Sequence, residues 1–229
     1  MRPVSSDPDP LATLLAAAAA GEFPSPDGSV SVVQLPPGSP VSAAILGFTS
    51  HHVVVTTVEP SALHARLELA AGVGAPLAPE FVAWLATACG GVPGTLDVVL
   101  AAPALPLGGS LDDTVAVRPV PPDLANPRVR RAAAFRTQIR TWVTWDDDAV
   151  LVVGRGLAGR WEAALEVLPG ARGRGIGRGL LAAARRVVPA GEFVFAQVAP
   201  GNAASLRAAL AAGYVPIGAE ILFGPPGAD

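Results

Sequence analysis

The sequence predicts an α/β protein in which helices flank a sheet. One observation is the bulky, mostly apolar stretch 161–168, which reads as a buried strand and leads through a glycine-rich loop into an apolar helical face that ends before Pro189. A second is the hairpin pattern of 137–145 and 149–155, which flank three consecutive aspartates. A third is the set of capped helices that alternate with these strands. Together they predict three successive antiparallel strands, then a loop and a helix.

The remaining elements follow from end signals and apolar patterns. Asp9 and Pro10 begin a helix that Gly21 ends, and Asn126 caps another before Pro127. The expected helices are 10–20, 60–71, 79–89 and 127–135, and the expected strands are 29–34, 41–48, 52–58, 96–101 and 193–198.

The proline-rich stretch 102–126 predicts an irregular connection between two parts of the chain. We therefore expect an N-terminal lobe, 1–125, and a second unit, 126–229. Residues 1–126 carry a charge of about −8 and residues 127–229 about +5, so the second part suits a ligand with several phosphates. The alternative is that this difference in charge between the two lobes arose by chance and has no functional meaning.

The overall composition is that of a globular protein, with 51% hydrophobic and 15% charged residues. The apolar run 10–20 favours a short helix over a signal peptide, because acidic residues precede it. One cysteine excludes an internal disulfide and predicts a reducing, cytoplasmic location. Three histidines and that cysteine form no zinc pattern, so we expect no metal. Arginine without lysine, with abundant alanine, glycine and proline, indicates a bacterial gene of high GC content.

The loop 172–179 alternates arginine or isoleucine with glycine. Glycines let backbone N–H groups approach a ligand closely, and the helix that follows adds unpaired donors and a partial positive charge. Such a loop predicts a phosphate or diphosphate site. A P-loop is excluded because there is no lysine, and the dinucleotide fingerprint because Arg178 or Leu180 stands where its third glycine is needed.

Two motifs resemble the GNAT acyltransferases over residues 135–224. Arg172, Gly175 and Gly177 match the Arg-x-x-Gly-x-Gly signature that binds acetyl-CoA, and Asn202 with Ser205 opens a helix that closes with Gly213-Tyr214. The resemblance implies a twisted, mixed and mostly antiparallel sheet. Strand, helix, helix, strand over 52–101 is similar to the first half of that fold. A separate N-terminal lobe is the alternative.

The resemblance also implies the activity, which is transfer of an acetyl group from acetyl-CoA, as co-substrate, to a primary amine of a small molecule or peptide by direct attack. Coenzyme A (CoA) would lie between strands 162–168 and 193–198. The residues implied to bind it are Leu165, Val167, Arg172, Gly173, Arg174, Gly175, Ile176, Gly177, Asn202 and Ser205. The two strand residues would act through their backbones. We expect no nucleic acid or membrane partner, and a homodimer is open.

Two carboxylates are candidates for the general base. Glu162 and Glu166 lie four apart on the central strand, so period-two geometry puts both on one face. A carboxylate on a buried strand is costly unless it is paired or functional. The alternative is a structural ion pair with Arg160 or Arg140.

One departure from the family pattern concerns the acid that protonates the CoA thiolate. Many members have a tyrosine seven positions after the asparagine, where this chain has Ala209. A non-catalytic acyl-CoA sensor or interaction module is therefore the second hypothesis. An RNA-binding arginine-glycine segment is a weaker third, because the stretch is single and lacks interleaved aromatic residues.

Overall fold

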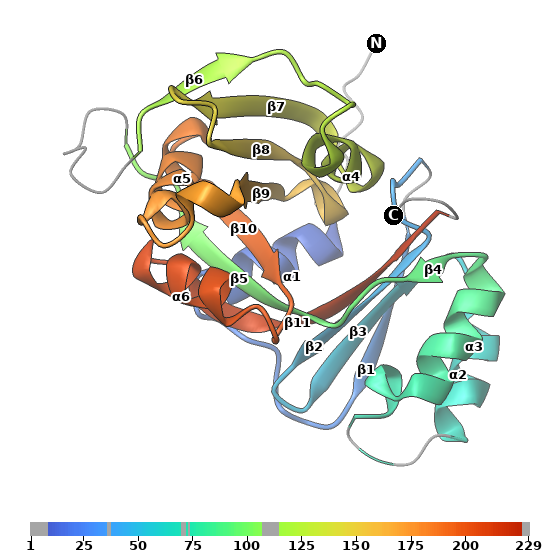
Figure 1. The fold of residues 1–229 in the computed structure, drawn as a ribbon. Coiled ribbons are helices and arrows are strands. Elements are labelled where there is room, and N and C mark those ends of the chain that lie inside the picture. The colour runs from blue at the N-terminus through green and yellow to red at the C-terminus, as the bar shows by residue number, and fades with distance from the viewer. Residues whose placement is uncertain (1–8, 36–37, 70–71, 73, 107–114, 226–229) are drawn as a thin grey trace, which may run out of the picture.

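The computed structural model describes residues 9–35, 38–69, 72, 74–106 and 115–225. These residues form an 11-stranded sheet with helices on both faces (Figure 1). In sheet order the strands are β1 (Val30–Gln34), β3 (His51–Thr56), β2 (Ala43–Phe48), β11 (Val215–Gly224), β5 (Asp97–Pro103), β10 (Phe193–Val198), β9 (Trp161–Val167), β8 (Ala149–Arg155), β7 (Thr137–Thr144) and β6 (Val117–Val120), with β4 (Val92–Pro93) beside β11. The pairs β1–β3 and β9–β10 are parallel and the other pairs are antiparallel, so the predicted mixed, mostly antiparallel α/β fold is confirmed.

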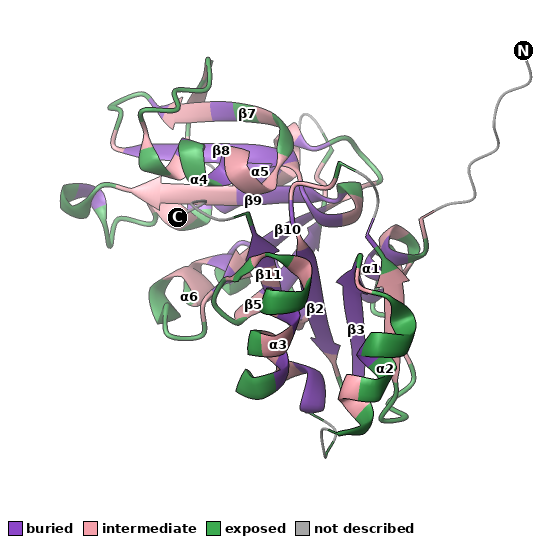
Figure 2. Ribbon diagram, turned by 90° about the vertical axis from the view of Figure 1, so that its right-hand side faces the viewer, coloured by how far each residue is buried: buried purple, intermediate pink, exposed green. Residues whose placement is uncertain are grey.

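The helices divide between the two faces of the sheet. They are α1 (Pro10–Ala19), α2 (Pro60–Glu68), α3 (Pro79–Cys89), α4 (Pro127–Phe135), α5 (Ile176–Val187) and α6 (Ala203–Ala211). Alternate residues of the buried strands point to opposite sides. Leu151 and Val194 therefore pack under α5 and α6, whereas Val152 packs under α4 and Phe195 under α1. Figure 2 shows β2 and β3 buried, with exposed residues on the outer side of α2.

The predicted helix starts depend on capping side chains that the structure contains. The Asp9 carboxylate accepts a hydrogen bond from the Leu11 N–H (2.9 Å), and Asn126 Oδ1 accepts one from the Arg128 N–H (2.9 Å). At α5 the prediction was four residues late. This helix begins at Ile176, directly after Gly175, whose φ of +82° makes the turn from the loop.

Two further differences concern the connecting segments. The stretch 102–126, expected to be irregular, contributes β6, which pairs with β7 along Val117–Val120. The expected helix end at residue 71 lies outside the described residues, and α2 ends at Glu68.

The place of β5 links the two halves of the sequence. This strand comes from the N-terminal half, yet it lies between β10 and β11 and pairs antiparallel with both. On β11 the register shifts between Pro216 and Gly218, so Ile217 faces the α1 side whereas Ile221 faces α3. One sheet therefore runs through both parts, while the expected domain boundary at residue 125 stays a prediction.

Candidate active site

A cleft opens where two parallel strands part. The strands β9 and β10 pair only at Trp161–Val194 and Glu162–Phe195. Beyond these pairs β8 is the only strand that pairs with β9 among the described residues, and the other edge of β9 lines a cleft of about 1210 Å³. A free strand edge offers N–H and C=O groups to an extended ligand. The predicted opening between these strands is therefore present.

The glycine-rich loop forms one end of this cleft. Gly173 and Gly175 have φ values of +78° and +82°, which L-residues adopt only with strain. Within the described part of the chain, the N–H groups of Gly173, Gly175, Ile176 and Gly177 donate no hydrogen bond. These donors stand at the N-terminus of α5, where the helix dipole favours an anion. The loop can therefore accept a diphosphate without breaking an internal bond.

The arginines of the loop lie differently from one another. Arg172 lines the cleft, and its Nε donates to the carbonyl of Val167 (3.0 Å) at the end of β9. Arg174 does not line the cleft and pairs with Asp148 in the β7–β8 hairpin (3.4 Å). Arg178 also lines the cleft, as does Arg207 of α6. The positive charge near the loop thus comes from α5 and α6 as well as from Arg172 of the loop itself.

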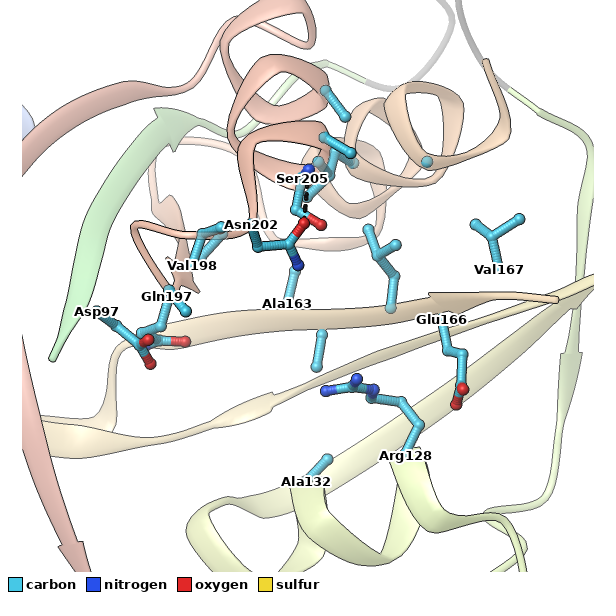
Figure 3. Close-up of a pocket in the computed structure, with 18 of the residues that line it drawn as sticks. Asp97, Arg128, Ala132, Ala163, Glu166, Val167, Gln197, Val198, Asn202 and Ser205 are labelled. Carbon is cyan, nitrogen blue, oxygen red and sulfur yellow. Dashed lines mark hydrogen bonds between the residues drawn. The ribbon is translucent and has the colours of Figure 1, made fainter. Parts of the chain in front are cut away.

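The helix α6 forms the wall opposite β9. Asn202 caps it by accepting a hydrogen bond from the Ser205 N–H (3.1 Å), and its amide nitrogen points toward β9 (Figure 3). Ser205 and Ala208 line the cleft, whereas Ala209 is fully buried in the core. The position at which family members carry tyrosine is therefore packed and apolar here.

The predicted CoA-binding residues come together in this one cleft, with one exception. Those that line it are Leu165, Val167, Arg172, Gly173, Gly175, Ile176, Gly177, Asn202 and Ser205. The exception is Arg174.

Of the two predicted bases, Glu162 is fully buried and held by two arginines. Its oxygens lie 2.7 Å from Arg160 Nε and 2.8 Å from Arg136 Nε, and the Leu157 N–H donates to it (3.3 Å). Burial alone would raise the pKa of Glu162, but the two guanidinium charges outweigh it and hold that pKa below the ordinary value. The geometry favours the structural ion pair with Arg160 over the base role.

The same network includes a second buried carboxylate. Arg160 Nη2 donates to both oxygens of Glu220 on β11, at 2.8 and 2.7 Å. Burial and the neighbouring carboxylates of Glu162 and Asp97 raise the pKa of Glu220, against the pull of Arg160. The network ties β9, β11 and the end of α4 together behind the cleft.

Two other carboxylates reach the cleft. Glu166 lines it near the outer end of β9, on the α4 side (Figure 3). Asp97 of β5 lies beside Gln197, away from Glu166 (Figure 3). Burial raises the pKa of Asp97, although a hydrogen bond from Thr95 (3.1 Å) and the charge of Arg131 oppose this. A half-buried carboxylate with a raised pKa suits proton abstraction.

Sequence reasoning missed Asp97, Arg128, Arg131 and Arg207. Asp97 belongs to the N-terminal half, and only the insertion of β5 brings it to the cleft. The two arginines of α4 are three apart on a capped helix, so a shared face could have been read from their spacing. The spacing does not show, however, on which side of the sheet that helix packs.

Neither a metal-binding group nor a membrane-spanning helix is found among the described residues. No three His, Cys, Asp or Glu side chains there are grouped so that they could hold a metal ion. None of the described helices is both long and apolar enough to span a membrane.

Comparisons with known proteins agree with this geometry. The sequence model of the acetyltransferase (GNAT) family matches residues 115–214, from the start of the β6 region to Tyr214. No curated protein matches the sequence.

The similarity to solved structures is distant. One, a GNAT family acetyltransferase from Colwellia psychrerythraea, is 11% identical with a TM-score of 0.38, over 64% of this chain and 62% of that one. A GCN5-related N-acetyltransferase from Kribbella flavida is 17% identical with a TM-score of 0.40, over 64% of each chain. A GNAT family protein from Novosphingobium aromaticivorans is 14% identical with a TM-score of 0.39, over 58% of this chain and 64% of that one. The match thus spans less than two thirds of each of these chains.

These structural likenesses are distant, so the assignment depends on the sequence match together with the loop and cleft that it contains. Residues 115–214 of this chain form an acetyltransferase domain of the GNAT family.

Proposed function

We propose that the protein transfers an acetyl group from acetyl-CoA to a primary amine by direct attack. The observation that carries this proposal is the row of unengaged N–H groups at Gly173, Gly175, Ile176 and Gly177, which face a cleft between parted strands. Membership of the GNAT family supports the same chemistry.

The shape of the cleft suggests how CoA would lie. Its diphosphate would sit on the loop amides at the start of α5, with Arg172 and Arg207 nearby. Its pantetheine arm would add to the open edge of β9 along Leu165–Val167, in the manner of an extra strand. A backbone N–H of β9 would then polarise the thioester carbonyl at the inner end of the cleft.

The base would take a proton from the attacking amine. Asp97 is the candidate that we favour, because it lies beside Gln197, away from the glycine-rich loop, and its pKa is raised by burial. Glu166 lies nearer the phosphate end, beside Val167, and stays the second candidate.

Direct attack needs no nucleophile on the protein. The only cysteine, Cys89, lies on α3 outside the residues that line the cleft, and burial raises the pKa of its thiol. Both properties work against a thiolate intermediate. A single cysteine also fits a reducing compartment, so we propose a cytoplasmic location.

The departing thiolate needs a proton donor. Since Ala209 is buried and apolar, the hydroxyl of Ser205, which lines the cleft one helical turn earlier, is our candidate. The absence of the usual tyrosine also favours a second function, a sensor that binds acyl-CoA without turning it over.

The loop is tested by comparing Gly175→Val with Gly191→Val. Both glycines have similar positive φ values, +82° and +86°, and a Cβ at either would meet no atom within 4 Å. Both variants therefore carry a similar backbone strain, of about 1–2 kcal/mol. Gly191 lies in the turn before β10, outside the cleft, and serves as the matched control.

Calorimetry with CoA measures the outcome. Gly175→Val should weaken CoA binding by about 100-fold or more, since two lost charge-assisted hydrogen bonds are together equivalent to about 3 kcal/mol. Gly191→Val should bind CoA as the wild type does. Unchanged CoA affinity in a folded Gly175→Val variant would overturn the assignment.

Turnover separates the enzyme from the sensor. Release of free CoA from acetyl-CoA is measured across a panel of primary amines. Acetylation of any amine supports the enzyme, and CoA binding without turnover on all of them supports the sensor.

A further inference from the structure

One face of α4 brings positive charge to the cleft on the side away from α5 and α6. Arg128 and Arg131 are one turn apart on this face, followed by Phe135 and Arg136. An adjacent face carries Val129, which is buried against β8. Packing of Val129 therefore fixes the helix so that its arginines line the cleft.

Two of these arginines have partners within the protein. Arg136 pairs with Glu162 (2.8 Å) and donates to Gln197 Oε1 (3.1 Å). The Arg131 guanidinium lies over the ring of Phe135, 5.7 Å from its centre. Their charges are thus at least partly committed to the fold.

Arg128 is different. Its Nε is buried without an acceptor, and within the described residues its side chain makes no hydrogen bond or ion pair. Burial lowers the pKa of Arg128, and Glu166 is the nearby carboxylate whose charge opposes this. Leaving a buried donor without a partner costs free energy, which a bound acceptor group would recover.

The surrounding charges select the kind of anion. A guanidinium presents two parallel donors that match a carboxylate or a phosphate. Asp97 and Glu166 line the same cleft on either side of Arg128 (Figure 3), and their charges would repel a second negative charge. A singly charged carboxylate therefore fits better than a doubly charged phosphate.

We propose that the acetyl acceptor is an amine that also carries a carboxylate, such as an amino acid, and that Arg128 binds this carboxylate from α4. The inference rests on the proposed acetyl transfer and adds the substrate class to it. Asp97, which lies beside Gln197 away from Glu166, would then face the amine of the same molecule (Figure 3).

The test measures binding rather than turnover. The protein, saturated with CoA, is titrated by calorimetry with matched N-acetyl amino acids and N-acetyl amino acid amides over a range of side chains. N-acetylated phosphoethanolamine is the phosphate probe. The wild type should bind the best acid about tenfold or more tightly than its amide, because a charge-assisted hydrogen bond is lost with the amide.

Arg128→Gln should remove this preference and leave CoA affinity unchanged. The matched control is Arg130→Gln, on the same helix, because Arg130 is exposed and donates to the Leu124 carbonyl (3.3 Å) outside the cleft. Arg128→Lys keeps the charge without the paired donors, so it should also reduce the preference for acids over amides. This variant provides the test if Arg128→Gln fails to fold.

Several results would overturn the inference. These are equal binding of acids and amides by the wild type, no binding of any acid, tighter binding of the phosphate probe, or a preference that survives in Arg128→Gln. Loss of CoA affinity in Arg128→Gln would place this side chain in the CoA site instead. Failure of the proposed function is a separate result, seen as no CoA binding or no acetyl transfer by the wild type.

Discussion

Replacing Glu162 by glutamine distinguishes a structural carboxylate from a catalytic one. Glutamine keeps the shape and can still accept from Arg160, but it removes the negative charge between Arg160 and Arg136. Breaking a buried ion pair costs about 3–5 kcal/mol. Since Arg160 keeps both bonds to Glu220 and Arg136 keeps Gln197, we expect the lower end, a loss of about 3 kcal/mol in the free energy of unfolding.

Urea unfolding at pH 7 measures this loss, with Glu192→Gln as the control. Glu192 pairs with Arg155 at 2.9 Å, but the two side chains are 39% and 28% exposed. An exposed pair contributes about 1 kcal/mol or less, so the control should change little.

The pH dependence has a definite sign. Because the folded-state pKa of Glu162 lies below its ordinary value of 4.5, the carboxylate stabilises the fold fully above that value and loses this effect as pH falls through the folded pKa. The gap between the wild type and Glu162→Gln should therefore be full at pH 7 and narrow as the pH falls below 4.5.

Enzyme kinetics test the alternative that Glu162 is the catalytic base. If Glu162 is structural, folded Glu162→Gln keeps the acidic limb of the pH–rate profile, whereas Asp97→Asn loses that limb and about 10²–10⁴-fold in kcat. An unchanged stability of Glu162→Gln together with a lost acidic limb would refute this reasoning and make Glu162 the base. Loss of the limb in Glu166→Gln alone would assign the base to the other cleft carboxylate.

Three further predictions concern small residues around the site. A Cβ at Gly156 would overlap the Glu162 carboxyl group, so Gly156→Ala should lower the free energy of unfolding in urea by about 1–3 kcal/mol. The control Gly201→Ala, whose Cβ would meet no atom within 4 Å, should change it by about 0.5 kcal/mol or less. Ala209→Tyr should fail to gain activity and should lower the melting temperature, because this position is fully buried. Ser205→Ala should lower kcat without changing CoA affinity, and an unaltered kcat would exclude Ser205 as the acid.

Local patterns predicted the C-terminal elements well because each signal is contained in a few neighbouring residues. The three aspartates after Thr144 turn the β7–β8 hairpin, and Asn126 caps α4 as expected. The short strand β6 gave no such signal, since Pro119 lies within it and prolines surround it. Its strand conformation comes from pairing with β7, which is a tertiary contact.

The candidate site divides in the same way. The glycine-rich loop before α5 could be predicted because glycine spacing and a helix start are local properties. The ion pairing of Glu162 could not be predicted in this way. One partner, Arg136, is 26 positions away and reaches Glu162 only because α4 packs over β8 and β9. The alternation of β9 placed Glu162 and Glu166 on one face, but only the fold shows that one is enclosed and the other lines the cleft.

The insertion of β5 explains why the proposed acceptor end of the cleft differs in origin from the proposed CoA end. The family match begins at residue 115, so it includes the loop, β9, β10 and α6 but not β5. Yet β5 pairs with β10 along Pro103–Val98 and carries Asp97 to the cleft. The proposed CoA end is built from a local motif within the matched domain, whereas the proposed acceptor end needs a strand from the first half of the chain together with α4. A change of acceptor would thus require substitutions in β5 and α4, and the loop between β9 and α5 could stay as it is.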